Sequence, residues 1–491
     1  MKLLIRLSLL VLTVVSLTPA QTGTRLVDYN AKSLGRGGTS IGVFDSPELM
    51  MTNPAGISFL NSSIIDADFS LMFPSLQFKN SLNDASRDKN VFPLPSLSYV
   101  NKYPDSKWSW GIGFFTSGGM GADFHLNNAL FGAALQDYHS KLASMQGGLT
   151  VAYKFNDNFS VGISAHLVYS MLEFSMPYSL DPSIMKGIAV PGMTFGQMFA
   201  APPSQGGFGY DEVTALAKMT DLVGIGFNGK IGFAYKVNDN LSFGLSYTMP
   251  TSLTYKSGKA SMDMTAQLND AFGKAVQGAM MQYGMTQTQA QSAVMGQFAG
   301  MGIDLSKGVA ANYDLNVDLK SPQSIGFGVS VNASQNVKLS ADCEWIDWAD
   351  AFDKMTIKLS NGNNSNINTM LGNNGTFNLD FPMNWKDGVV LKIGGEYNVN
   401  KELTLRLGYA FGNNPVPEST IFPVFPAIVE NHLMVGASYK VSNPLTIHAA
   451  LELGLNKSET ASNPSLIANE YNGSTSQLST TLVHVAVSYS L

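Results

Sequence analysis

The sequence has 491 residues, with 30 Lys and Arg against 36 Asp and Glu, and a formal net charge of −6. This acidic balance gives no electrostatic reason to bind nucleic acid, so we expect no nucleic-acid partner. Only 13% of the residues are charged, against about 25% in a typical soluble domain, yet no apolar run after the first 20 residues is long enough for a membrane-spanning helix.

The first 20 residues have the pattern of a secretory signal peptide. Lys2 and Arg6 give a basic start, residues 7–17 are almost entirely apolar, and residues 18–20 form a cleavage site with a terminal alanine. The apolar stretch is shorter than the roughly 20 residues that a membrane-spanning helix requires. We therefore expect residues 1–20 to be removed and residues 21–491 to lie outside the inner membrane.

Residues 21–60 form a separate segment. They lack any alternation of apolar and polar residues and are rich in glycine, serine and asparagine. Strands of a sheet with one apolar face would alternate, so this segment is not expected to contribute to such a sheet.

From Ile64 onward the pattern changes to alternation. The clearest examples flank two similar turns, Asn156-Asp-Asn158 and Asn238-Asp-Asn240. On each side of these turns, apolar residues occupy every second position and small or polar residues lie between them. Because strand side chains alternate between faces, one face is apolar and the other small or polar. This arrangement is typical of an outer-membrane β-barrel with lipid outside and a polar lumen.

The alternating runs suggest 15 strands, whereas bacterial single-chain barrels have an even number. Short and long connections alternate along the whole chain if residues 337–360 form one strand, interrupted by a bulge near residues 348–352. The sequence thus predicts an all-β membrane protein, a 14-stranded antiparallel transmembrane β-barrel over residues 61–491, with both termini periplasmic. The runs are 64–73, 93–101, 108–117, 146–155, 158–169, 224–237, 240–255, 322–331, 337–347, 354–360, 388–399, 402–411, 432–441, 444–455 and 480–491.

Two outer connections, residues 170–223 and 256–321, are unusually long, and their segments 174–222 and 257–308 together contain 12 of the 24 methionines. In the second, apolar residues recur at helical spacing over residues 268–283 and 290–301, with Thr288 as a possible helix cap. The sequence therefore predicts helical extracellular loops.

The apolar stripes of these helices leave two interpretations open. Either the two loops pack on each other, or they form an apolar groove that captures a ligand, since methionine adapts to irregular apolar surfaces. The candidate ligand contacts of such a groove are Met280, Met281, Tyr283, Val294 and Phe298.

Catalytic chemistry finds little support. Asp342 and Glu344 lie on one face of a predicted strand, as paired acids could, but Lys338 shares that face and favours a charge network in the lumen. No His-x-x-x-His pattern or cysteine pair is present. We expect no catalytic residues, no metal and no cofactor. An outer-membrane lipid-modifying enzyme is the enzymatic alternative.

Several segments resemble one known family, the FadL/TodX outer-membrane transporters of hydrophobic compounds. The matching segments follow the family order from residue 33 to about residue 441 and cover most of the chain. They include Ser33-Leu-Gly-Arg-Gly-Gly38, Met51-Thr-Asn-Pro-Ala-Gly56, Gly111-Ile-Gly-Phe-Phe-Thr-Ser-Gly-Gly119, Glu344-Trp-Ile-Asp-Trp348, Asn384-Trp-Lys-Asp387 and Asn414-Pro-Val-Pro-Glu418.

The resemblance implies that residues 21–60 fold as a hatch, or plug, inside the lumen, with Arg36 and Asn53-Pro54-Ala55 among its residues. Asn53-Pro54-Ala55 would then form a rigid turn beside the ligand path. The alternative is a helix or turn start without a ligand role, since asparagine caps helices and proline fixes the backbone angle φ.

The resemblance also implies a lateral exit beside a kinked third strand. Here the kink falls at Ser117, Gly118 and Gly119, because glycine weakens a strand interior and permits bulges. The alternative is a glycine-rich strand tip that only leads into the next loop.

The function expected from this resemblance is passive uptake of a hydrophobic small molecule, first a long-chain fatty acid and second an aromatic hydrocarbon. The expected location is the bacterial outer membrane, as a monomer surrounded by outer-membrane lipid and inserted by the barrel-assembly machinery. The non-enzymatic alternatives are a general outer-membrane porin and an adhesin or structural barrel.

Conductance in planar bilayers distinguishes a plugged transporter from a general porin. If residues 21–60 block the lumen, the intact protein should show no large stable channels, and a variant without residues 21–60 should show them. Large stable channels from the intact protein would instead favour the porin.

Overall fold

The computed structural model describes residues 23–86, 91–462 and 465–491. The expected signal peptide, residues 1–20, lies outside the described residues. Among the described residues, no helix is long and apolar enough to cross a membrane.

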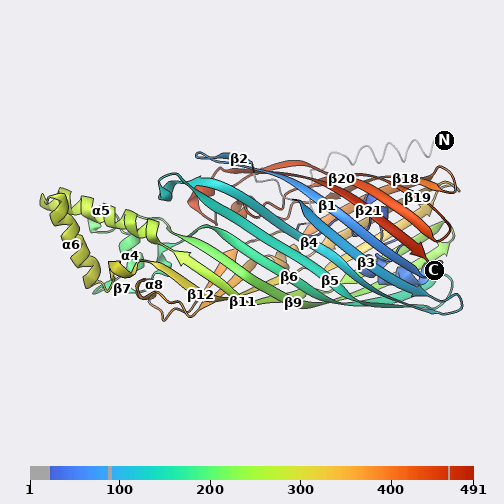
Figure 1. Ribbon diagram of the computed structural model, residues 1–491, viewed down its shortest axis with the longest axis horizontal. Coiled ribbons are helices and arrows are strands. Elements are labelled where there is room, and N and C mark those ends of the chain that lie inside the picture. The colour runs from blue at the N-terminus through green and yellow to red at the C-terminus, as the bar shows by residue number, and fades with distance from the viewer. Residues whose placement is uncertain (1–22, 87–90, 463–464) are drawn as a thin grey trace.

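The described strands close into a 14-stranded antiparallel barrel, as the alternation and the connection lengths predict (Figure 1). The ring closes where the first strand pairs with the last, from Ile64 opposite Ser490 to Lys79 opposite Thr475. Ten strands are continuous: β1 (Ile64–Lys79), β3 (Phe92–Lys102), β4 (Trp108–Asn128), β5 (Ala134–Lys154), β6 (Phe159–Leu180), β9 (Val213–Asn238), β18 (Leu403–Gly412), β19 (Asn431–Lys440), β20 (Leu445–Thr460) and β21 (Thr475–Ser490).

The other four strands of the ring are each broken in two. Each lower half pairs within the apolar wall, and each upper half continues beyond it on the outer side. The pairs are β10 (Leu241–Thr248) with β11 (Thr251–Asp263), β13 (Ser324–Asn332) with β12 (Ala310–Ser321), β14 (Val337–Ile346) with β15 (Lys354–Ser360), and β17 (Gly388–Asn398) with β16 (Phe377–Pro382). Short strands β2 (Asp84–Ser86), β7 (Ile188–Val190) and β8 (Met193–Thr194) lie in the outer connections.

The interruption between residues 337 and 360 is a helical turn rather than the predicted bulge. Helix α7 (Trp348–Ala351) begins after Asp347, whose side chain accepts a hydrogen bond from the Asp350 backbone N–H. This local cap stabilises a turn of helix where a strand was expected. The prediction of one interrupted strand is confirmed, and the nature of its interruption is corrected.

The outer loops are shorter than the predicted ranges 170–223 and 256–321, because the strands continue into them. In β12 apolar and polar residues still alternate, but the apolar residues now face inward. Tyr313, Leu315 and Val317 are buried inside, whereas Asn312 and Asn316 are exposed. Outside the membrane a barrel meets water on its outer face, so its apolar residues turn inward. A search for apolar residues on the lipid face therefore misses these strand ends.

Helices occupy the outer end and the N-terminal segment. Helix α5 (Thr265–Tyr283) and helix α6 (Gln287–Gly300) project from the outer end as a hairpin, remote from the C-terminus (Figure 1). The capping box of α6 is formed by Thr286 and Gln289, two residues before the predicted Thr288. The remaining helices are α2 (Ala31–Gly35), α3 (Leu49–Thr52), α4 (Phe195–Ala200), α8 (Ser365–Leu371) and the 3-10 turns η1 (Pro54–Phe59), η2 (Ala129–Phe131), η3 (Pro182–Ile184), η4 (Pro203–Gln205), η5 (Leu305–Lys307), η6 (Glu418–Thr420) and η7 (Asn469–Tyr471).

Residues 23–60 are mostly buried and contact inward-facing residues around the ring of strands. Arg36 is fully buried, and its Nη1 lies 2.9 Å from Asp45 and 2.7 Å from Glu396 on β17. On another side, the Asn53 amide donates to the Phe233 carbonyl of β9 at 3.0 Å. Asp342 of β14 accepts the backbone N–H groups of residues 40 and 41 at 2.7 and 3.0 Å. The lumen charge network predicted from Asp342, Glu344 and Lys338 therefore holds this segment.

Replacement of Arg36 tests how firmly this segment is held. Removing one partner of a buried ion pair costs about 3–5 kcal/mol, so Arg36→Met should loosen residues 23–60 without opening the backbone ladder of the wall. The measurement is the rate at which trypsin cleaves at Lys32 in the folded barrel, and Arg36→Met should raise it.

The matched control is Lys79→Met, which removes an exposed ion pair with Asp84 at 2.7 Å. Exposed pairs contribute about 0–1 kcal/mol, so this variant should be cleaved like the wild type. Equal cleavage of both variants would show that Arg36 does not hold the segment.

Candidate functional site

The wall of the barrel lacks part of one backbone ladder, between β3 and β4. Strand β3 pairs with β1 as far as Phe92. It pairs with β4 only from Lys102 to Ser96, opposite Ser109 to Phe115. Residues 92–95 of β3 and the part of β4 beyond Phe115 therefore face each other without ladder pairing, which leaves a lateral gap. We call this stretch the β3–β4 gap.

The sequence of β3 explains why its edge tolerates this gap. Residues 93 and 95 are both proline, which has no backbone N–H to donate. The Pro95 carbonyl points toward β4, because it accepts a hydrogen bond from Thr116 Oγ1 at 3.0 Å. The nitrogens of Pro95 and Pro93 then face the same edge, since the polar groups of alternate strand residues share one side. No N–H of these two residues is left without a partner at the gap.

On the other side of the gap, β4 bulges and meets the N-terminal segment. The register of β4 against β5 shifts between Thr116 and Gly118, so Ser117 is the extra residue. Directly behind it, the Gly119 N–H donates to the Thr24 carbonyl at 3.0 Å, and Arg25 bridges to Gly118. A Cβ at Gly118 would lie 2.2 Å from the Thr24 oxygen, so only glycine admits this contact.

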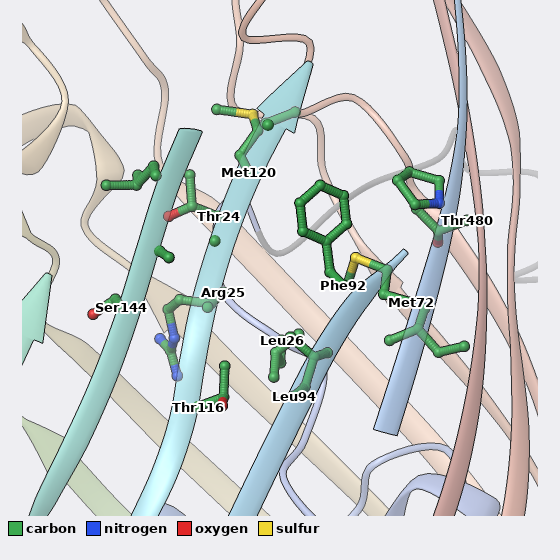
Figure 2. Close-up of a pocket in the computed structure, with 18 of the residues that line it drawn as sticks. Thr24, Arg25, Leu26, Met72, Phe92, Leu94, Thr116, Met120, Ser144 and Thr480 are labelled. Carbon is green, nitrogen blue, oxygen red and sulfur yellow. The ribbon is translucent and has the colours of Figure 1, made fainter. Parts of the chain in front are cut away.

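A cavity of about 390 Å³ lies behind the β3–β4 gap. Figure 2 shows Leu94 and Phe92 on β3, Met72 on β1 and Met120 on β4 around it, with Thr24 to Leu26 of the N-terminal segment on its inner side. Most of the lining is apolar, and the volume is within the range of about 300–1,000 Å³ that is usual for small-molecule sites.

The lumen on the inner side of the Thr24–Gly118 contact is narrower and contains charged and amide groups. A smaller cavity of about 70 Å³ is lined there by Asn228, Lys230 and Gln146. The Arg25 guanidinium lies 2.9 Å from Glu344, and Lys392 donates to the Val27 carbonyl. Charged and amide groups therefore join the lining on this side, beside aromatic residues such as Trp348 and Phe352.

The residues predicted for the N-terminal segment all lie in the lumen, but away from the 390 Å³ cavity. Asn53 caps the turn η1 by accepting the Ala55 N–H at 3.3 Å, and Pro54 occupies the first turn. These residues pack so closely on β9 that a Cβ at Gly232 would lie 2.1 Å from Asn53 Oδ1. Arg36 is held by carboxylates, as described above. The predicted Ser117, Gly118 and Gly119 lie at the β3–β4 gap itself.

The five predicted loop residues do not come together at a cavity. Met281 and Tyr283 are 77% and 64% exposed on α5, and Met280 is 38% exposed. Val294 and Phe298 are buried where α6 packs against α5, with the rings of Phe272 and Phe298 at 5.9 Å between centroids. Many loop methionines, such as Met185 and Met198, are buried within the outer apolar core. The structure therefore shows packing at the buried residues, and ligand capture by the exposed ones stays a prediction.

Sequence reasoning missed most of the cavity lining. Met72, Phe92 and Leu94 belong to predicted strands, or border them, but alternation alone does not say which positions face a void. The prolines at positions 93 and 95 could have predicted the gap, because proline within a sheet occurs mainly at strand edges that lack a ladder partner. His432 was also overlooked as a lumen residue, although the exposed Leu433 and Val435 fix its side of β19.

The enzymatic alternative gains no support from the described residues. Asp342 accepts backbone hydrogen bonds and Glu344 pairs with Arg25, so both acids serve the N-terminal segment. Ser40 lies in a Gly-x-Ser-x-Gly pattern, but its Oγ is buried and donates to Asp28 at 2.7 Å. No group of three or more potential metal ligands occurs among the described residues.

Comparison with known sequences decides the family. The sequence profile of the family described as outer membrane protein transport protein (OMPP1/FadL/TodX) matches residues 12–491. The chain belongs to this family. The resemblance found in the sequence is thus confirmed, and so is the location in the bacterial outer membrane.

Individual members of the OMPP1/FadL/TodX family are distant in sequence. The long-chain fatty acid transport protein of Escherichia coli K12 is 24% identical over 261 residues, which cover 50% of this chain and 56% of that protein. The protein of the same name from Shigella flexneri is 23% identical with the same coverage. The match spans only about half the length of these curated relatives.

Solved structures share the fold over almost the whole chain. The Pseudomonas putida toluene transporter TodX has a TM-score of 0.67 at 19% identity, covering 95% of this chain and 99% of that one. A Pseudomonas aeruginosa FadL homologue has a TM-score of 0.67 at 16% identity, covering 96% and 100%. At these identities the likeness shows the fold, a closed 14-stranded barrel.

Substitutions in the outer helices distinguish packing from an exposed surface. Phe298→Ala removes a buried aromatic side chain, which costs about 3–5 kcal/mol in protein cores, so α5 and α6 should become more sensitive to proteases. Met281→Gln changes an exposed side chain and should leave the cleavage rate of these helices unchanged. Limited proteolysis of the folded barrel measures both. Equal sensitivity of the two variants would contradict this assignment of roles.

Proposed function

We propose that this protein is a passive outer-membrane channel that takes up long, mostly apolar molecules, with long-chain fatty acids first and aromatic hydrocarbons second. The observation that carries the proposal is the position of the cavity. An apolar cavity of about 390 Å³ lies directly behind the stretch where β3 and β4 run beside each other without ladder pairing.

Lateral release through the β3–β4 gap is the route that we propose. Transfer of apolar surface from water to an apolar medium is favourable by roughly 25 cal/mol per Å². A ligand that continued down the lumen would exchange apolar contacts for Lys230, Arg25 and the charges around Arg36. Exit through the gap releases it into hydrocarbon instead.

Capture at the outer end belongs to the same proposal. Met280, Met281 and Tyr283 expose apolar surface on α5, at the end of the molecule that faces the medium. Val294 and Phe298 support this surface by packing α6 beneath it. Exposed apolar surface of this kind favours transient contact with a greasy solute.

The segment 21–60 acts as a hatch in this proposal, and residues 61–491 act as the barrel that carries the ligand path. The filled lumen argues against a general porin, which needs an open water-filled channel. The proposed activity is transport and not catalysis. We further propose that the protein is a monomer in outer-membrane lipid, inserted by the barrel-assembly machinery and exported by the signal peptide of residues 1–20.

Closing the gap from the inside tests the route. In Gly118→Leu the side chain collides with the Thr24 carbonyl, and both groups then obstruct the opening. Uptake of labelled hexadecanoate by cells that lack their own transporter should fall to the rate of cells without this protein, while binding to the cell surface persists.

The matched control is Gly147→Leu on the adjacent strand β5, where an added Cβ would meet atoms only at 3.6 and 3.8 Å. This variant should transport like the wild type. Undiminished uptake by a correctly folded Gly118→Leu protein would rule out the gap as the exit.

A further inference from the structure

One end of the apolar cavity carries buried polar atoms that do not hold the barrel together. His432 and Thr480 both line this cavity. His432 is only 7% exposed, and neither ring nitrogen makes a hydrogen bond among the described residues, although Nδ1 lies close to Glu452. The buried Oγ1 of Thr480 likewise has none within the described part of the chain. Buried polar atoms in native proteins are nearly always paired, so two such atoms in one cavity need an explanation.

The two atoms belong to one row across three strands. His432 of β19 lies opposite Gly454 of β20, and Gly454 lies opposite Thr480 of β21. A Cβ at Gly454 would lie 2.2 Å from Thr480 Oγ1 and 3.4 Å from His432 Cε1. The glycine therefore lets the threonine hydroxyl lie close over the backbone of β20, on the same side of the wall as the imidazole and the Val429 side chain.

The imidazole of His432 is held in place from behind. Its Nδ1 lies 2.7 Å from one oxygen of Glu452, and the other oxygen of that carboxylate lies 3.5 Å from Nε2 of His484. The Nδ1 of His484 in turn bonds to Ser70, which donates to Asp68. A carboxylate beside one imidazole nitrogen favours the proton on that nitrogen and leaves the other nitrogen for a ligand. For His432 this other nitrogen is Nε2.

We propose that His432 and Thr480 form a polar anchor that binds the oxygen-bearing head group of the transported molecule, a carboxyl or a hydroxyl. The alkyl chain then lies along the apolar lining formed by Met72, Phe92 and Leu94. This inference rests on the proposed function and adds to it a preference for amphipathic ligands over plain hydrocarbons.

The chemistry of the two groups suits both head groups. A neutral imidazole with its proton on Nδ1 accepts a hydrogen bond at Nε2 from an alcohol or a protonated acid, and an imidazolium donates to a carboxylate. The threonine hydroxyl donates or accepts. An alkane forms a hydrogen bond with neither the imidazole nor the hydroxyl. A site that hydrogen-bonds a polar group binds an analogue without that group much more weakly.

Three ligands of equal chain length test the anchor: hexadecanoic acid, hexadecan-1-ol and hexadecane. Their affinities are measured by competition for the full-length protein in amphipol. The wild type should bind the acid and the alcohol at least about tenfold more tightly than the alkane. His432→Phe and Thr480→Val should each reduce this preference about fivefold, as expected for one lost hydrogen bond, and leave alkane binding unchanged.

The control is Leu94→Ala, which shortens an apolar lining residue and should lower the affinity for all three ligands by the same factor. Thr480→Val is nearly isosteric and keeps the test valid if His432→Phe does not fold. Equal wild-type affinity for the three ligands, or a preference that survives both substitutions, would overturn the anchor and leave the proposed function standing. If the wild type bound none of the three ligands, the proposed function itself would fail.

Discussion

The structure depends on the pairing of backbone N–H and C=O groups in a medium that offers no hydrogen bonds. Hydrocarbon makes each unpaired group costly, so a membrane wall of strands must close on itself. Here the ring closes through the β1–β21 ladder, and the pairing fails beside β3 and β4. The exception is tolerated because Pro93 and Pro95 bring no donors to the open edge, while the bulge at Ser117 turns β4 toward Thr24. A defect in the ladder thus becomes an opening in the wall.

The barrel has two levels, which differ in whether the apolar side chains of the strands point outward or inward. Within the membrane, apolar side chains such as Phe227 and Ile231 point outward and the lumen is polar; beyond it, residues such as Leu315 and Val317 point inward. Outward charges then pair across the outer strands, as Lys259 does with Asp314. The apolar interior of the outer level and the apolar exterior of the inner level are the two surfaces that the proposed lateral route would connect at the β3–β4 gap.

Residues 23–60 fill the polar lumen. Buried ion pairs hold them in position, and small residues of the wall let them approach closely. Buried charges hold the segment in position, with Glu396 lying 2.7 Å from Arg36 and 3.1 Å from Arg406. Small residues allow it to approach, since a Cβ at Gly394 would lie 1.8 Å from the Arg36 carbonyl. Such a network is costly to break, because a charge left without its partner in a buried site is strongly destabilising. The inner contacts thus keep this segment inside the lumen.

The sequence by itself determined the barrel, its strand number and the separate N-terminal segment, because alternation and connection length are local properties of the chain. It also located the glycines at 118 and 119, whose flexibility is intrinsic. It could not locate the outer strand ends, because their apolar residues lie on the inner face. It also could not locate the cap of α6, because Thr286 and Thr288 are both suitable capping residues. Only the tertiary structure brought His432, Gly454 and Thr480 into one row and placed Met72 beside Phe92. A cavity consists of space between strands distant in sequence, and the register that aligns those strands depends on closure of the whole ring.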